Sequence, residues 1–122
     1  MNQVCPFCST TEIILSNDLA FAIYDRFPVS EGHMLIIPRR HMEDLWSSTS
    51  KERQALGDLL EECKKHLDKM FAPAGYNIGI NCGEAAGQTI FHLHIHLIPR
   101  YIGDIENPRG GVRGVIPSRR IY

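Results

Sequence analysis

The sequence lacks several features that would place it in a specialised class of protein. No apolar run approaches the roughly 20 residues that a membrane-spanning helix needs. With 13 basic and 14 acidic residues, the formal net charge is −1, which creates no bulk field for nucleic acid or a membrane surface. The first residues, MNQVCPFC, have neither the charged lead nor the apolar core of a signal peptide. We therefore expect a cytoplasmic protein without a nucleic-acid or membrane partner.

Cysteine is sparse, and no internal repeat is visible. At 122 residues, of which 43% are hydrophobic, the chain suits a single domain with a real core. We expect that domain to span residues 1–122, with an irregular tail from about residue 103 to 122. Cys5-Pro-Phe-Cys8 has the spacing of half a tetrahedral zinc site. A redox pair is the competing interpretation, although redox C-x-x-C normally follows a strand of a βαβ unit.

Hydrophobic periodicity predicts several strands and one long helix. Residues 49–71 place apolar side chains every three or four positions, and Thr49 and Glu52 have the spacing of a capping box. The connections are short, which favours an α+β fold in which an antiparallel sheet carries the helix on one face. We expect strands over residues 11–16, 19–24, 33–38, 76–82 and 92–98.

The run HLHIHLI at residues 92–98 is the strongest chemical signal. Strict alternation puts three imidazoles on one face of a strand, which we expect to stop before Pro99. The aliphatic face should pack under the helix, and the histidine face should open to solvent. A neutral imidazole can attack a phosphoryl centre, and a neighbouring imidazolium can protonate the leaving oxygen. A catalytic zinc is the alternative, although residues about 6.5 to 7 Å apart on one strand converge poorly on one ion.

Residues 83–89 form a glycine-containing loop directly before the histidines. Its backbone N–H groups and the Thr89 hydroxyl could face a bound anion. A plain hairpin loop is the alternative.

The form His-φ-His-φ-His-φ-φ, together with GHMLIIPRRH and GQTIF upstream, resembles the histidine triad (HIT) family of nucleotide hydrolases and transferases. The tail GGVRGVIP looks like that of a zinc-containing microbial branch, which resembles the dinucleoside polyphosphate hydrolases, rather than that of the shorter phosphoramidase branch. The resemblance implies a five-stranded antiparallel sheet with one long helix and a short one, and a homodimer with a ten-stranded sheet. It also implies hydrolysis at the α-phosphate of nucleotides through a nucleotidyl-histidine intermediate, with substrates such as diadenosine tetraphosphate.

The resemblance also assigns roles to individual residues. His94 would be the nucleophile, His96 would contact the leaving-group oxygen as an imidazolium acid, and His33 would support the triad. A polyphosphate substrate could bring Mg²⁺ with it. The implied nucleotide-binding residues are Ile23 and Leu35 at the base, Asp25 at the ribose, and Asn81, Gln88 and Thr89 at ribose or phosphate. The implied ligands of a structural zinc are Cys5, Cys8, His41 and His92.

Other functions remain compatible with the same residues. A nucleotidyltransferase or phosphorylase shares the first half-reaction and differs only in the second acceptor. A nucleotide-binding regulator would use slow hydrolysis as a timer, and a plain zinc-binding protein would need neither His94 nor His96. The arginines of the tail are either solvated or reach a polyphosphate or a partner subunit.

Overall fold

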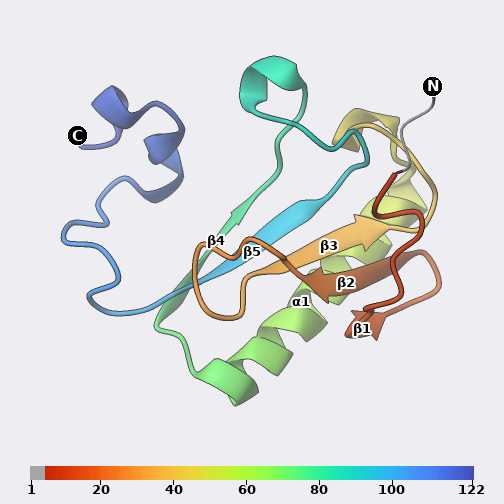
Figure 1. Cartoon of the computed structure of the whole chain (residues 1–122), viewed down its shortest axis with the longest axis horizontal. Coiled ribbons are helices and arrows are strands. Elements are labelled where there is room, and N and C mark those ends of the chain that lie inside the picture. The colour runs from red at the N-terminus through yellow and green to blue at the C-terminus, as the bar shows by residue number, and fades with distance from the viewer. Residues whose placement is uncertain (1–4) are drawn as a thin grey trace.

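The computed structural model describes residues 5–122 and shows a five-stranded antiparallel sheet with one long helix on one face (Figure 1). The strands lie in the order β1-β2-β3-β5-β4. This arrangement confirms the expected α+β fold. The elements are β1 (Leu15–Ser16), β2 (Ala20–Tyr24), β3 (Met34–Pro38), α1 (Ser50–Phe71), β4 (Gly75–Gly79) and β5 (Ile95–Arg100).

Helix α1 begins and ends where the local sequence predicts. The Thr49 hydroxyl accepts a hydrogen bond from the Glu52 N–H at 3.1 Å, and the Glu52 carboxylate accepts one from the Thr49 N–H at 2.8 Å. This is the reciprocal capping box that the spacing predicts. At the other end, Ala72 adopts the left-handed conformation with φ 48°, and its N–H donates to the Asp68 carbonyl.

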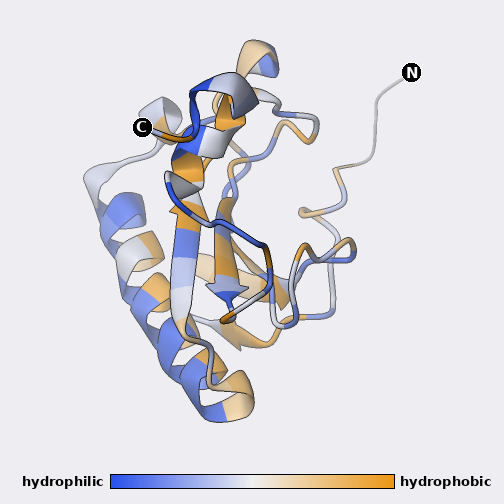
Figure 2. Ribbon diagram, turned by 90° about the vertical axis from the view of Figure 1, so that its left-hand side faces the viewer, coloured by the Kyte–Doolittle hydropathy of each residue, from blue (hydrophilic) through white to orange (hydrophobic). Residues whose placement is uncertain are grey.

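The main core lies between α1 and the sheet. Figure 2 shows the hydrophobic side of the helix turned toward the sheet and its hydrophilic side turned outward. Leu93, Ile95 and Leu97 are buried in this core, as the alternation of the histidine run predicts. The helix contributes Leu56, Leu59, Cys63 and Leu67 to it.

The opposite face of the sheet is also covered. Phe7, from the N-terminal segment, packs with apolar side chains of β2 and β3 in a second buried cluster. His92 and His94 lie under this cover, and His94 is 9% exposed. The expectation that the histidine face opens to solvent therefore fails for His92 and His94, because a segment distant in sequence folds over them, whereas the His96 side chain is 23% exposed.

The histidine run and β5 do not coincide. The strand begins at Ile95, so His92 and His94 precede it, and it continues through Pro99 to Arg100. The pairing of β5 with β3 ends at Leu97, so Pro99 has a strand neighbour only in β4. Proline, which has no backbone N–H to donate, is tolerated at such a position. For the same reason Pro38 lies inside β3: pairing with β5 ends at Ile36.

The remaining differences are small. The fourth strand stops at Gly79 instead of residue 82, and the expected strand over 11–16 pairs at two residues only. The other helical segments of residues 5–122 are 3-10 turns, and no helix in that range is long and apolar enough to cross a membrane. Strand β4 is an edge strand, and the ten-stranded dimer stays a prediction. The 3-10 turns of residues 5–122 cover Leu45–Ser47, Glu84–Ala86, Gly111–Val115 and Pro117–Arg119.

Candidate active site

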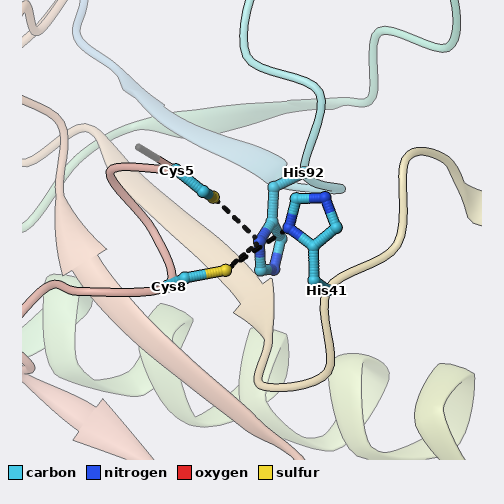
Figure 3. Close-up of side chains that lie close together, drawn as sticks. All are labelled: Cys5, Cys8, His41 and His92. Carbon is cyan, nitrogen blue, oxygen red and sulfur yellow. Dashed lines mark hydrogen bonds between the residues drawn. The ribbon is translucent and has the colours of Figure 1, made fainter. Parts of the chain in front are cut away.

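Cys5, Cys8, His41 and His92 come from three separate segments and meet at one point (Figure 3). The Cys5 Sγ lies 3.3 Å from His92 Nδ1, and the Cys8 Sγ lies 3.3 Å from His41 Nδ1. All four potential ligand atoms lie within 4.8 Å of one another. Two thiols and two imidazole nitrogens are the donor set of a structural zinc site. The cluster could therefore hold a metal ion.

The ring of His92 is fully buried and oriented toward the sulfur atoms. Its Nε2–H donates to the Pro38 carbonyl at 2.8 Å, which leaves the lone pair on Nδ1. Burial lowers the pKa of His92, so the ring stays neutral near pH 7. Metal-ligating histidines commonly donate their second N–H to a backbone carbonyl in this way.

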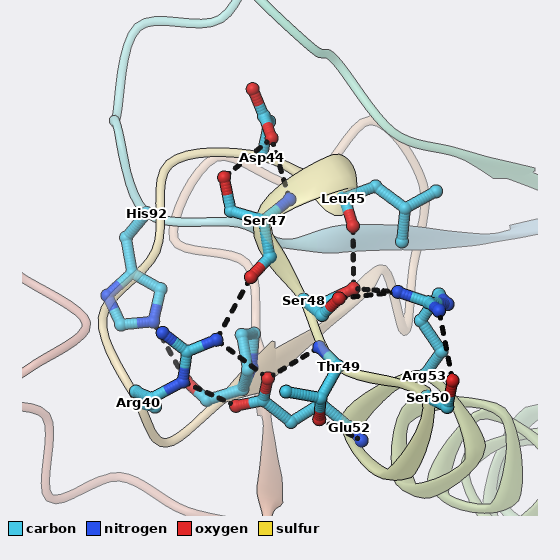
Figure 4. Close-up of polar contacts among 11 residues, drawn as sticks. Arg40, Asp44, Leu45, Ser47, Ser48, Thr49, Ser50, Glu52, Arg53 and His92 are labelled. Carbon is cyan, nitrogen blue, oxygen red and sulfur yellow. Dashed lines mark hydrogen bonds and ion pairs between the residues drawn. The ribbon is translucent and has the colours of Figure 1, made fainter.

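A buried carboxylate at the start of α1 supports the segment that carries His41. Glu52 accepts hydrogen bonds from Arg40 Nε at 3.0 Å and Arg40 Nη2 at 2.8 Å, and Arg40 also donates to the Ser47 carbonyl (Figure 4). The hydrogen bonds from Arg40 lower the pKa of Glu52 to about 2. Since Arg40 directly precedes His41, this ion pair ties the cluster of two cysteines and two histidines to the helix N-terminus.

His94 presents an unprotonated nitrogen to a cavity. Its Nδ1–H donates to the His92 carbonyl at 2.8 Å, so the neutral ring carries its lone pair on Nε2. Nε2 has no hydrogen-bond partner within the described part of the chain, and His94 lines the cavity. This nitrogen is available as a nucleophile.

A chain of hydrogen bonds sets the tautomer of His96. The Val29 N–H donates to His33 Nδ1 at 3.2 Å, so the proton of a neutral His33 is on Nε2. That Nε2–H donates to His96 Nδ1 at 2.9 Å, which places the His96 proton on its own Nε2. His96 therefore offers an N–H donor on the side away from His33.

Burial keeps this pair of rings neutral. It lowers the pKa of His33, and burial with the neighbouring His94 and His33 lowers the pKa of His96 to about 4. The free site therefore holds a neutral His96 near pH 7, and the expected imidazolium is absent there because charging a buried ring is costly.

Asp25, His33 and His96 form a second group whose potential ligand atoms lie within 4.8 Å of one another. It does not suit a metal ion, because His33 Nδ1 already accepts the Val29 N–H and its Nε2 carries the proton. Neither of the two clusters found among residues 5–122 offers the oxygen-rich ligand set that Mg²⁺ prefers. The expectation of magnesium gains no support.

A cavity of 680 Å³ opens beside these histidines, a volume within the range of small-molecule sites. The end of β2, the N-terminal segment and the loop before β5 form its walls. The structure thus brings most of the predicted catalytic and nucleotide-binding residues to one cavity. Those that line it are Ile23, Asp25, Leu35, Asn81, Thr89, His94 and His96.

Gln88 and His33 lie outside the cavity lining. The Gln88 Oε1 accepts the Gly83 N–H at 2.8 Å, and its Nε2 donates to the Glu43 carbonyl at 2.7 Å. Its carboxamide therefore holds the loop in shape. Sequence reasoning missed Phe7, which lines the cavity and whose one signal is its place inside C-x-x-C. Sequence reasoning also missed the Val29 N–H, which sets the tautomer of His33 and for which the sequence carries no signal.

Comparisons with known sequences and with solved structures both find HIT proteins. Residues 8–103 match the sequence profile of the HIT domain. A HIT-like protein of Mycoplasma genitalium is 39% identical over 103 residues, which are 80% of this chain and 73% of that protein. The asymmetrical bis(5'-nucleosyl)-tetraphosphatase of Schizosaccharomyces pombe is 33% identical over 79% of this chain, which spans 53% of that enzyme. The crystal structure of a zinc-bound histidine triad family protein from Mycobacterium smegmatis matches with a TM-score of 0.75 at 31% identity, covering 82% of this chain and 77% of that one.

Proposed function

This chain belongs to the HIT domain family, and from that premise we propose that it is a nucleotidyl hydrolase. It cleaves at the α-phosphate of nucleotides through a nucleotidyl-histidine intermediate on His94. Dinucleoside polyphosphates such as diadenosine tetraphosphate are the proposed substrates. The tetraphosphatase of S. pombe, similar over most of this chain, supports that substrate class.

The orientation of His94 is the observation that carries the proposal. Its Nδ1–H is held by the His92 carbonyl, so the lone pair of Nε2 is available at the cavity without any prior proton transfer. The ring cannot tautomerise without losing that hydrogen bond. An imidazole held in this way can attack a phosphoryl centre directly.

The reaction then takes two displacements. In the first, the Nε2 lone pair of His94 forms a bond to the α-phosphorus, and the bond from phosphorus to the leaving-group oxygen breaks. The His96 Nε2–H donates a hydrogen bond to that oxygen and stabilises its developing charge. In the second, water attacks the same phosphorus and the P–N bond breaks, which releases the mononucleotide and a proton and restores His94.

The cavity walls suit a nucleotide. Ile23 and Leu35 offer apolar surface for the base, and Asp25 offers a carboxylate for the ribose hydroxyls. Asn81 and Thr89 line the same cavity and would contact the ribose or a phosphate. Gln88 contributes by holding the loop that carries Thr89, since its carboxamide is already bonded to the backbone.

A structural zinc would be held by Cys5, Cys8, His41 and His92. The zinc-bound relative from M. smegmatis supports this choice of metal. The ion would fix the N-terminal segment to the start of β5. His92, whose carbonyl accepts the His94 Nδ1–H, is one of the four ligands. Phe7, whose ring contacts that of His94, lies in the turn between the two cysteines.

The test is a product assay on diadenosine tetraphosphate and an adenosine phosphoramidate, with and without added phosphate. His94→Ala should lower turnover at least about a thousandfold, as removal of a nucleophile does elsewhere, while nucleotide binding is retained. Wild-type protein quenched by denaturation at alkaline pH, which preserves a P–N bond to histidine, should carry one nucleotidyl group by mass spectrometry, and His94→Ala should carry none.

His66→Gln is the matched control, because His66 lies on α1 and does not line the cavity, and a glutamine amide can keep the hydrogen bond to the hydroxyl of Tyr24, which does line it. Its turnover should stay near that of wild type. Equal turnover in His94→Ala would refute the mechanism. Release of a nucleoside diphosphate only with added phosphate would show a phosphorylase, and tight nucleotide binding without turnover would show a regulator.

A further inference from the structure

Phe7 joins the metal cluster to the histidine that faces the cavity. It lies in the turn between Cys5 and Cys8, where the Cys8 N–H donates to the Cys5 carbonyl at 3.2 Å. Its side chain is 6% exposed. The ring centroid is 5.0 Å from that of His94, at an interplanar angle of 65°, and 5.9 Å from that of His92. Such edge-to-face contacts between rings are attractive and directional.

The restraints on the His94 ring are few. One hydrogen bond holds Nδ1, and the neighbouring rings are those of Phe7 and His96. A single hydrogen bond fixes one atom of the ring and leaves its tilt to be set by packing. In-line attack on phosphorus depends on that tilt, since a misplacement of about 1 Å can cost about a hundredfold in rate.

Taking the proposed function as its basis, we propose that Phe7 is the positioning residue for His94, and that the metal cluster acts on the nucleophile through the Phe7 ring as well as through the His92 carbonyl. The Cys5–Cys8 turn sets the position of Phe7, and the Phe7 ring sets the tilt of the imidazole. Metal occupancy then controls the rate of the chemical step as well as stability.

Phe7→Leu tests the positioning role, because leucine keeps an apolar side chain in the cluster but removes the flat ring. Phe21→Leu is the matched control: Phe21 belongs to the same buried cluster but does not line the cavity. Phe7→Leu should lower kcat by about tenfold or more with KM changed little, the pattern of a group that acts in the transition state. Phe21→Leu should leave kcat near that of wild type.

The metal link is tested by a double-variant cycle with Cys8→Ser, whose metal content should fall while that of Phe7→Leu stays at the wild-type level. If the cluster acts through Phe7, the combined variant should be no slower than Cys8→Ser alone. Multiplied effects on kcat would overturn the link, because they would show that Phe7 acts on His94 independently of the cluster.

A second readout does not depend on turnover. In a long-range ¹⁵N–¹H spectrum, the ring protons of His94 should shift and broaden in Phe7→Leu, since they lose the ring current and the restraint of the aromatic neighbour, and should stay unchanged in Phe21→Leu. A wild-type protein without turnover would defeat the proposed function and leave this measurement decisive for Phe7. An unchanged His94 spectrum, an unchanged kcat, or a rise in KM alone would overturn the positioning role.

Discussion

Replacing Glu52 by glutamine should destabilise the protein by about 2 kcal/mol at neutral pH. Glu52 is nearly buried and binds Arg40 through both carboxylate oxygens. The fall of its pKa from 4.5 to about 2 corresponds to about 3 kcal/mol of stability above pH 4.5. The Arg40 side chain is 54% exposed, so water screens the pair, and we expect about two thirds of that value. Glutamine can still accept the Thr49 N–H, so the variant removes mainly the charge.

The effect of Glu52 should also depend on pH in a defined direction. A carboxylate whose pKa is lowered by folding stabilises the folded state above its unfolded pKa, and this contribution is lost as the pH falls through the folded pKa. The difference between wild type and Glu52→Gln should therefore shrink from about 2 kcal/mol at pH 7 to about 1 kcal/mol at pH 3. Comparing the two proteins at each pH cancels the titration of the histidines.

Urea denaturation followed by circular dichroism measures this difference, and the melting temperature should fall by about 6 to 10 °C at pH 7. Glu62→Gln is the control, because Glu62 pairs with Lys65 on the exposed face of α1 and should change stability by less than about 0.5 kcal/mol. A Glu52→Gln protein as stable as this control, or a difference that grows toward low pH, would refute the assignment.

Two further predictions concern the histidines and the metal. Protein purified without chelators should contain about one zinc per chain. Chelation should lower the melting temperature by several degrees, because the ion binds the folded cluster and joins three segments of the chain. Metal-free protein of equal stability would contradict this prediction. Folding lowers the pKa of His96 from 6.5 to about 4, so the unfolded chain binds more protons and stability should fall as the pH drops from 6.5 to 4. His96→Asn should flatten that slope, and an unchanged slope would exclude the buried neutral imidazole.

The predictions that held were those that depend on local pattern. The capping box at Thr49 and Glu52 and the apolar repeat that follows lie within one helix, so they could be predicted without knowing the partner surface. The alternation of Leu93, Ile95 and Leu97 correctly predicted which side chains join the core under α1. The ends of strands were less accurate: β5 was expected to stop before Pro99 but continues through it, because proline is tolerated where a neighbouring strand stops, and that depends on pairing.

The candidate site also combines features that the sequence predicts with features that depend on the folded structure. The types of residue that meet at the cavity and at the cysteine–histidine cluster were identified from motif and resemblance. Their protonation was not, since it depends on backbone groups at Val29, Pro38 and His92 that no motif specifies. Phe7 packs against His92 and His94, so these two rings are buried where the alternation alone predicted a solvent-facing set.

Short-range periodicity and spacing were enough to predict the long helix, the antiparallel sheet, and which histidines and cysteines are available as chemical groups. The tertiary structure alone decided which nitrogen of each histidine carries the proton, that Glu52 and Arg40 pair beside His41, and that Phe7 covers His94. Each of these depends on groups far apart in the chain, and the energy of a hydrogen bond or ring contact depends on distances that only the folded chain defines.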